Sequence, residues 1–121
     1  MSVWITSYLL YGYKFTKKKE IKIIDEHCEE LMEEKPYSEM FNNDDSDQIL
    51  VEDGMCGNYI YIGLKLASID EDEDDACVNI SENDIQDLKN KLYDHMKSWP
   101  DYLINMVKNY EPSLYLFTHA S

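Results

Sequence analysis

The chain of 121 residues contains no arginine, and its only strongly basic residues are eleven lysines. Arginine is the residue best suited to forked recognition of phosphate groups and of guanine. The lysines face 25 acidic residues, so the formal net charge is −14. Because a protein must present a basic surface to neutralise phosphates, this composition argues against direct binding of nucleic acid.

Cysteine and glycine are also scarce. Cys28, Cys56 and Cys77 form no C-x-x-C pair, and a scattered odd set is typical of reduced thiols in a cytosolic protein. The sequence contains no glycine-rich phosphate loop, no nucleophile-elbow motif and no H-E-x-x-H motif. Acidic residues are so abundant that a carboxylate pair carries no signal for catalysis. We therefore expect a protein that is not an enzyme, with no catalytic residues, no cofactor and no specific metal site.

Long apolar runs are absent as well. The longest, Val3–Phe15, is too short and too polar to span a bilayer, and it lacks the features of a signal peptide. We therefore expect no membrane association and a cytoplasmic location. Apolar residues nevertheless make up 44% of a 14.3 kDa chain, which is enough for one hydrophobic core. The chain is expected to form a single acidic domain over residues 1–121.

Hydrophobic periodicity predicts the secondary structure. Alternating apolar residues predict four strands, at Val3–Phe15, Gln48–Val51, Asn58–Ala67 and Ser113–His119. Helical spacing predicts a first helix within Lys18–Glu34, a second capped by Ser81 and a third that begins at Pro100. The order strand, helix, strand, strand, helix, helix, strand indicates an α+β fold. We expect about four mostly antiparallel strands covered by two or three helices.

Acidic residues are concentrated in two blocks, with twelve acids in Asp25–Asp53 and nine in Asp70–Asp87. On the first predicted helix, six acids form two rows at i, i+4 spacing without an interleaved lysine: Asp25, Glu26, Glu29, Glu30, Glu33 and Glu34. Like-charge neighbours at this spacing destabilise a helix by about 0.2–0.5 kcal/mol per pair. Six charges over ten helical residues give one charge per ~2.5 Å, which approaches the ~1.7 Å of duplex DNA.

The second block opens with six consecutive acids: Asp70, Glu71, Asp72, Glu73, Asp74 and Asp75. Their spacing fits an EF-hand calcium loop only in part. Asp75 stands where the loop needs glycine, and Ser81 stands where it needs a bidentate glutamate. A weak divalent-cation-binding protein therefore remains an alternative interpretation.

Together the two blocks predict a small acidic inhibitor that imitates nucleic-acid charge and blocks a basic nucleic-acid-handling protein. Tyr37, Tyr59 and Tyr61 are candidate aromatic anchors beside the acids. Abundant lysine, asparagine, isoleucine and tyrosine with no arginine are typical of an A·T-rich genome, such as that of a low-GC bacterium or its phage. This favours a phage counter-defence protein of the anti-CRISPR or anti-restriction type, acting in the host cytoplasm.

Two other interpretations remain open. Charge runs are usually solvated faces, so the acidity can serve solubility alone. The chain can also be a non-catalytic structural or assembly module in which a tyrosine-rich sheet face pairs with a second copy or a neighbour. The strand Ser113–His119 is then the edge most exposed to such pairing, and a homo-oligomer is one form that this alternative can take. The sequence does not determine whether the two acidic blocks share one face.

Overall fold

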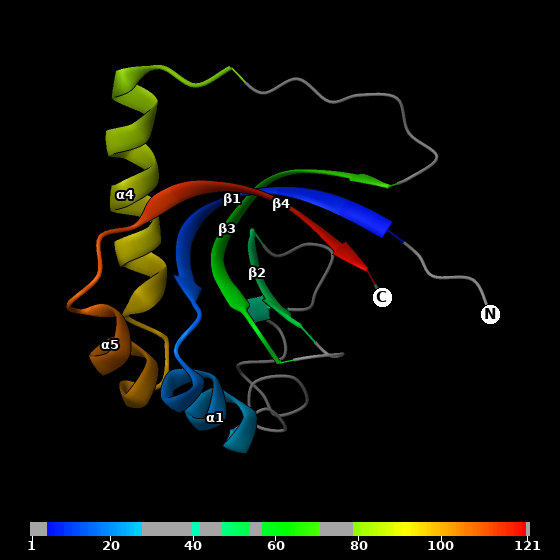
Figure 1. The fold of residues 1–121 in the computed structure, drawn as a ribbon. Coiled ribbons are helices and arrows are strands. Elements are labelled where there is room, and N and C mark those ends of the chain that lie inside the picture. The colour runs from blue at the N-terminus through cyan, green and yellow to red at the C-terminus, as the bar shows by residue number, and fades with distance from the viewer. Residues whose placement is uncertain (1–4, 28–39, 42–46, 54–56, 71–78, 121) are drawn as a thin grey trace.

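The computed structural model describes residues 5–27, 40–41, 47–53, 57–70 and 79–120. Its strands are β1 (Ile5–Phe15), β2 (Gln48–Glu52), β3 (Ile60–Asp70) and β4 (Ser113–Ala120). In the same ranges the helices are α1 (Lys18–Glu26), α4 (Glu82–Met96) and α5 (Asp101–Val107) (Figure 1). The element order and the α+β fold confirm the prediction. None of the helices in these ranges is long and apolar enough to cross a membrane.

All four strands belong to one antiparallel sheet with the spatial order β2-β3-β1-β4. The first predicted strand, at Val3–Phe15, is β1, which lies between β3 and β4. β2 and β3, the second and third predicted strands, form a hairpin in which Leu50 lies opposite Ile62. The edges of this sheet are therefore β2 and β4.

The main core lies between one face of the sheet and the helices. β3 contributes Ile60, Ile62 and Leu64, which alternate along the strand as predicted. The helices contribute apolar residues that are almost completely buried: Ile21 and Ile24 from α1, Leu92 from α4, and Leu103 and Val107 from α5. The apolar residues that recur at helical spacing in the sequence therefore face this core.

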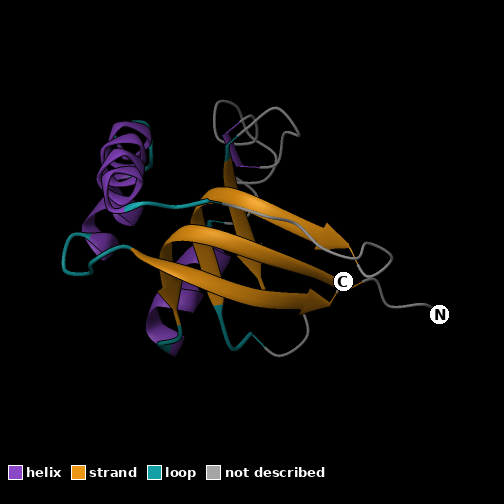
Figure 2. Cartoon of the chain, turned by 90° about the horizontal axis from the view of Figure 1, so that it is seen from above, coloured by secondary structure: helices purple, strands orange, loops and turns teal. Residues whose placement is uncertain are grey.

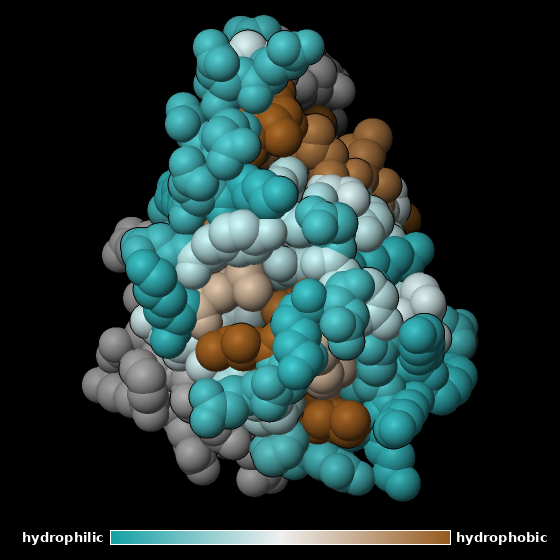
Figure 3. Space-filling model, turned by 90° about the vertical axis from the view of Figure 1, so that its left-hand side faces the viewer, coloured by the Kyte–Doolittle hydropathy of each residue, from teal (hydrophilic) through white to brown (hydrophobic). Residues whose placement is uncertain are grey.

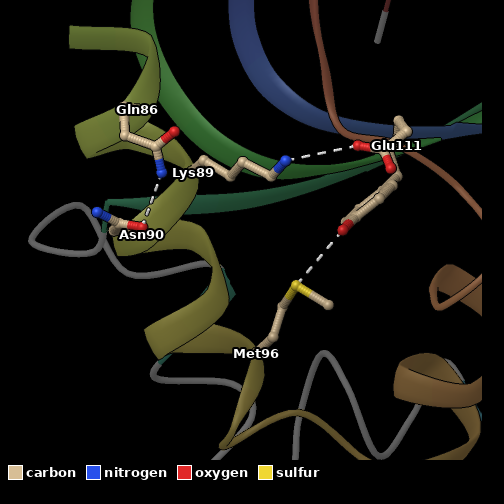
Figure 4. Close-up of polar contacts among 6 residues, drawn as sticks. Gln86, Lys89, Asn90, Met96 and Glu111 are labelled. Carbon is tan, nitrogen blue, oxygen red and sulfur yellow. Dashed lines mark hydrogen bonds and ion pairs between the residues drawn. The ribbon is translucent and has the colours of Figure 1, made fainter. Parts of the chain in front are cut away.

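Two hydrogen bonds at the border of this core pair polar side chains of the sheet and of the α4 end. The indole Nε1 of Trp99 donates a hydrogen bond of 2.7 Å to the Oε1 of Gln48, a buried residue at the start of β2. At the same end of α4, the Tyr13 hydroxyl donates to the Met96 sulfur at 3.5 Å (Figure 4). Buried donors of this kind cost free energy unless they find such partners, so these contacts fix how α4 and its C-terminal turn dock on the sheet.

α4 is capped by Ser81, as the sequence predicted, and the cap is a complete capping box. The Asp84 backbone N–H donates to the Ser81 Oγ, and the Ser81 backbone N–H donates to the Asp84 carboxylate at 2.8 Å. α5 begins one residue later than predicted, because Pro100 is its N-cap and Asp101 its first residue. The fixed φ of proline suits either position.

The sheet is strongly curved (Figures 1 and 2). At its centre, Gly12 of β1 lies directly opposite Gly63 of β3. A Cβ atom on Gly12 would lie 2.2 Å from the Ile62 carbonyl oxygen and 2.7 Å from the Gly63 Cα. The two backbones therefore approach more closely than side chains would permit. Glycine pairs of this kind are typical of positions where a sheet bends.

The concave face of the sheet holds a second, smaller core, made of Leu10, Val51, Tyr61 and Phe117. The rings of Tyr61 and Phe117 stack at 3.7 Å with an interplanar angle of 2°. These residues belong to β3 and β4, which are not neighbours in the sheet. The curvature thus brings the start of β3 across the concave face to the end of β4.

Candidate functional site

The first predicted acidic surface begins at the C-terminal end of α1. Asp25 and Glu26 are exposed there, and neither forms an ion pair or side-chain hydrogen bond within the described part of the chain. The remaining residues of the two predicted rows, and one predicted anchor, lie outside the described residues: Glu29, Glu30, Glu33, Glu34 and Tyr37. The structure therefore places the start of this surface in solvent.

The charges of α1 oppose its macrodipole. Lysines 17 to 19 stand at its N-terminal end, whereas its last turn has no basic residue and ends with Asp25 and Glu26. A helix dipole favours acids at the N-terminus and bases at the C-terminus, by about 0.3–1 kcal/mol for each charge. The charge arrangement of α1 is thus not the one that would stabilise the helix best.

The second predicted surface begins at Asp70, which has a structural partner. The Thr6 hydroxyl donates a hydrogen bond of 2.9 Å to the Asp70 carboxylate, and the two residues are paired across β1 and β3. Asp70 therefore ties the end of β3 to β1. The other members of the predicted surface and of the calcium alternative lie outside the described residues: Glu71, Asp72, Glu73, Asp74 and Asp75. Among the described residues, no cluster of histidine, cysteine and carboxylate side chains could hold a metal ion.

The described ends of the two acidic blocks do not adjoin. In both ribbon views, α1 and the C-terminal end of β3 lie at opposite ends of the molecule (Figures 1 and 2). Asp25 and Asp70 therefore start their blocks at separate places on the surface.

Charge is divided unevenly between the described residues and the rest of the chain. The described ranges contain ten of the eleven lysines and 13 of the 25 acids, a net charge of −3. The remaining lysine and the remaining 12 acids give the other ranges a net charge of −11. Most of the net charge of −14 is therefore carried outside the sheet and helices described here.

Several acids of the described part are compensated by lysines of α4 and its C-terminal turn. Lys91 pairs with Asp47 at 2.9 Å, and its hydrogen bond and charge lower the pKa of that carboxyl. Lys89 extends from α4 toward Glu111 at 3.6 Å (Figure 4). Lys97 lies 3.5 Å from Asp94. These exposed pairs balance charge locally but contribute little to stability.

The two described candidate anchors lie on the concave face. Tyr61 is only 7% exposed because its ring stacks on Phe117, so it offers little surface to a partner in this conformation. Tyr59 is half-buried, and its hydroxyl shares a hydrogen bond of 3.0 Å with Nδ1 of His119. Burial, and then the charge of Asp53, raises the pKa of Tyr59. Both tyrosines therefore have packing roles within the chain.

Two clefts border the helices. One, of about 440 Å³, lies between α1 and α5 and is lined by polar side chains that include Lys17, Asn105 and Tyr110. The Tyr110 hydroxyl there donates to Glu20 at 2.7 Å. The other, of about 270 Å³, lies between α4 and the sheet and is lined largely by apolar groups such as Leu66 and Leu88. Among the described residues, neither lining contains a serine, cysteine or histidine.

The last strand is an edge, as the sequence predicted, and two of its leucines are exposed. Leu114 is 41% exposed and Leu116 is 79% exposed. Sequence analysis singled out the strand but not these side chains, because alternation alone does not say where the helix layer ends. Apolar surface also adjoins the polar surface of α4 in the space-filling view (Figure 3).

Comparison of the chain with models of protein families, with curated proteins and with solved structures found no match.

Proposed function

We propose that the protein is a non-catalytic inhibitor whose acidic residues imitate nucleic-acid charge and occupy the basic groove of a nucleic-acid-handling protein. One observation carries this proposal. The described body is nearly balanced at −3, and the remaining ranges concentrate 12 acids against one lysine. Asp25 and Glu26, at the described start of one block, are exposed. The described body thus carries little of the excess charge, and the proposal assigns the contact with the partner to the acids of the other ranges.

The amount of charge sets the size of the partner's groove. A total of −14 equals the charge of ~24 Å of duplex, or about seven base pairs. A concentrated field of one sign attracts an oppositely charged surface over long distances and speeds association. The inhibitor would therefore block a groove of that length but not coat a long track of binding sites.

The distribution of charge along α1 supports a functional role for its acidic residues. Asp25 and Glu26 stand at the helix end where the dipole disfavours them. Acids retained against local stability are expected where a cationic partner relieves the repulsion. If the acidity served solubility alone, the same net charge could be placed at helix N-termini without this penalty.

The composition suggests which partner to test first. A chain without arginine and rich in lysine, asparagine and isoleucine fits an A·T-rich genome. We therefore propose a phage protein that acts in the host cytoplasm against a defence nuclease or a DNA-metabolism enzyme. This proposal includes inhibitors of the anti-CRISPR and anti-restriction types.

A competition experiment tests the proposed function. The tagged protein is used to isolate a partner from the lysate of a low-GC bacterium, the partner is identified by its mass, and the purified pair is challenged with duplex DNA. We expect DNA to displace the inhibitor from the partner and to show no binding to the inhibitor itself. A complex that excess DNA leaves intact, or direct binding of DNA to the inhibitor, would contradict the proposal.

A further inference from the structure

β4 lacks the devices that normally protect an edge strand. Such edges are usually blunted by lysine, proline, inward-pointing charge or a bulge. The segment Ser113–Ala120 contains no lysine, no acid and no proline, and its pairing with β1 runs without a register shift. Among the described residues, β1 is the only strand that pairs with it. Within the described ranges, one backbone edge of β4 is therefore open to another strand.

The other edge of the sheet is different. β2 has only five residues, Gln48–Glu52, and charged residues stand at its end and on both flanks, at Asp47, Glu52 and Asp53. Short length and charge are both protective features of edge strands. The eight residues of β4 are thus the longer and less protected edge.

Exposed leucines accompany this open edge. Leu114 and Leu116 alternate along β4 on the face opposite Tyr115 and Phe117, which pack in the concave core. Exposure rises from 41% at Leu114 to 79% at Leu116. In Figure 1, β4 runs away from α4 and α5 toward its C-terminal end. Leu116 thus lies beyond the cover of the helices, where a single chain leaves it in solvent.

Charge indicates what covers this edge. Two chains of −14 repel each other over most of their surfaces. With histidine counted as neutral, the segment Ser113–Ala120 carries no charge, and Nδ1 of its His119 is already engaged by Tyr59. This strand has no acidic side chain that could pair with a basic partner. A second β4 is also without acidic residues and carries the same exposed leucines.

We propose that β4 pairs antiparallel with β4 of a second copy of this chain, so that the two sheets become one continuous sheet. A two-fold axis perpendicular to the sheet near the middle of β4 keeps both helix layers on the same side. Leu114 and Leu116 of one copy then lie beside the same leucines of the other. The inference goes beyond the proposed inhibitor function and does not depend on it.

Sedimentation equilibrium of the full chain tests the dimer. We expect a mass of twice 14.3 kDa at high protein concentration. Added salt should strengthen the dimer, because it screens the repulsion between two acidic chains. In the dimer, amide hydrogens of β4 should exchange more slowly as protein concentration rises.

Leu116→Lys should weaken the dimer at least tenfold, because it places two ammonium groups at the two-fold axis. Ser98→Lys is the matched control, since it makes the same charge change at an exposed position of the turn after α4 and should leave the dimer intact. Circular dichroism checks the fold, and Leu116→Thr replaces the lysine variant if that variant unfolds.

Three results would each overturn the pairing. They are a chain that stays monomeric at millimolar concentration in high salt, a dimer that Leu116→Lys or its threonine substitute leaves unchanged, and a dimer without protection of β4 amides. A monomeric protein that still competes with DNA for a basic partner would refute the dimer alone. A β4 dimer without such a partner would refute the inhibitor function alone.

Discussion

Tyr61 and Phe117 stack with their ring centroids 3.7 Å apart, although β1 separates the strands that carry them. The hydrogen bond between Tyr59 and His119 makes the same connection between the start of β3 and the end of β4. These contacts exist only because the sheet curves. The close approach of Gly12 and Gly63 lets it do so.

Gly12→Ala should therefore destabilise the fold by about 1–3 kcal/mol, the usual cost of overpacking a core. The added Cβ would lie 2.2 Å from the Ile62 carbonyl oxygen, and backbone must move to accommodate it. Gly57→Asn is the control, because Gly57 has a φ of +62° with open space around it and asparagine tolerates that conformation. Urea unfolding measures both variants. Equal stability of Gly12→Ala and the native chain would remove the glycine pair as the cause of curvature.

Gln48→Leu should cost about 1–3 kcal/mol, because it leaves the buried indole N–H of Trp99 without its acceptor. Adding Trp99→Phe removes that donor, so the double variant should lose less than the two single losses combined. Thermal unfolding of all four chains completes the double-mutant cycle. Strict additivity would show that the 2.7 Å contact has no energetic importance.

Asp84 makes the capping of α4 depend on pH. Hydrogen bonds from the Ser81 backbone and hydroxyl lower the pKa of Asp84 from its ordinary value of 3.8. A depressed folded-state pKa stabilises the protein above the unfolded pKa, and this stabilisation is lost as pH falls through the folded pKa. The difference in Tm between the native chain and Asp84→Asn should be constant above about pH 5 and shrink below about pH 4. A difference that persists in strong acid would contradict this role of the charge.

Glu26→Lys should stabilise the fold by about 0.3–1 kcal/mol, because it replaces an acid with a base at the C-terminal end of α1. A chain of this size should then melt about 2–5 °C higher. Ser98→Lys adds one positive charge away from α1, half the change in charge that Glu26→Lys makes, and serves as the comparison for the effect of net charge. A lower Tm for Glu26→Lys would show that this carboxylate stabilises the native state after all.

Local pattern predicted the elements of this fold because each depends on neighbours in the sequence. Alternation identified β1 and β3, and Ser81 with Asp84 marked the start of α4. Contacts between distant segments have no such signal. Gln48 and Trp99 are 51 residues apart, and nothing near either residue indicates its partner.

For the candidate site, the sequence predicted the acidic character but not the contacts of individual residues. The acid runs were evident from the sequence, but the structural role of Asp70 was not, because Thr6 lies 64 residues away. Tyr61 lies in the predicted strand Asn58–Ala67, and the sequence indicated a candidate anchor for a partner. Curvature of the sheet instead buried it against Phe117, which strand alternation does not predict.

The salt dependence of binding tests the central claim most directly. Glu71 to Asp75 are replaced by Gln and Asn, and Asp70 is kept because it holds Thr6. The control neutralises five exposed acids of the described surface: Glu82, Asp87, Asp94, Asp101 and Glu111. Affinity for the isolated basic partner is then measured over a range of salt concentrations for the native chain and both variants.

If the acid run replaces phosphates, the logarithm of the native affinity should fall steeply and linearly with the logarithm of salt concentration. The slope should flatten by about one unit for each partner contact that the loop variant loses. The control should keep the native slope. An unchanged slope in the loop variant, or an equal change in both variants, would contradict the account, since the charge of Glu71 to Asp75 would then have no specific part in binding.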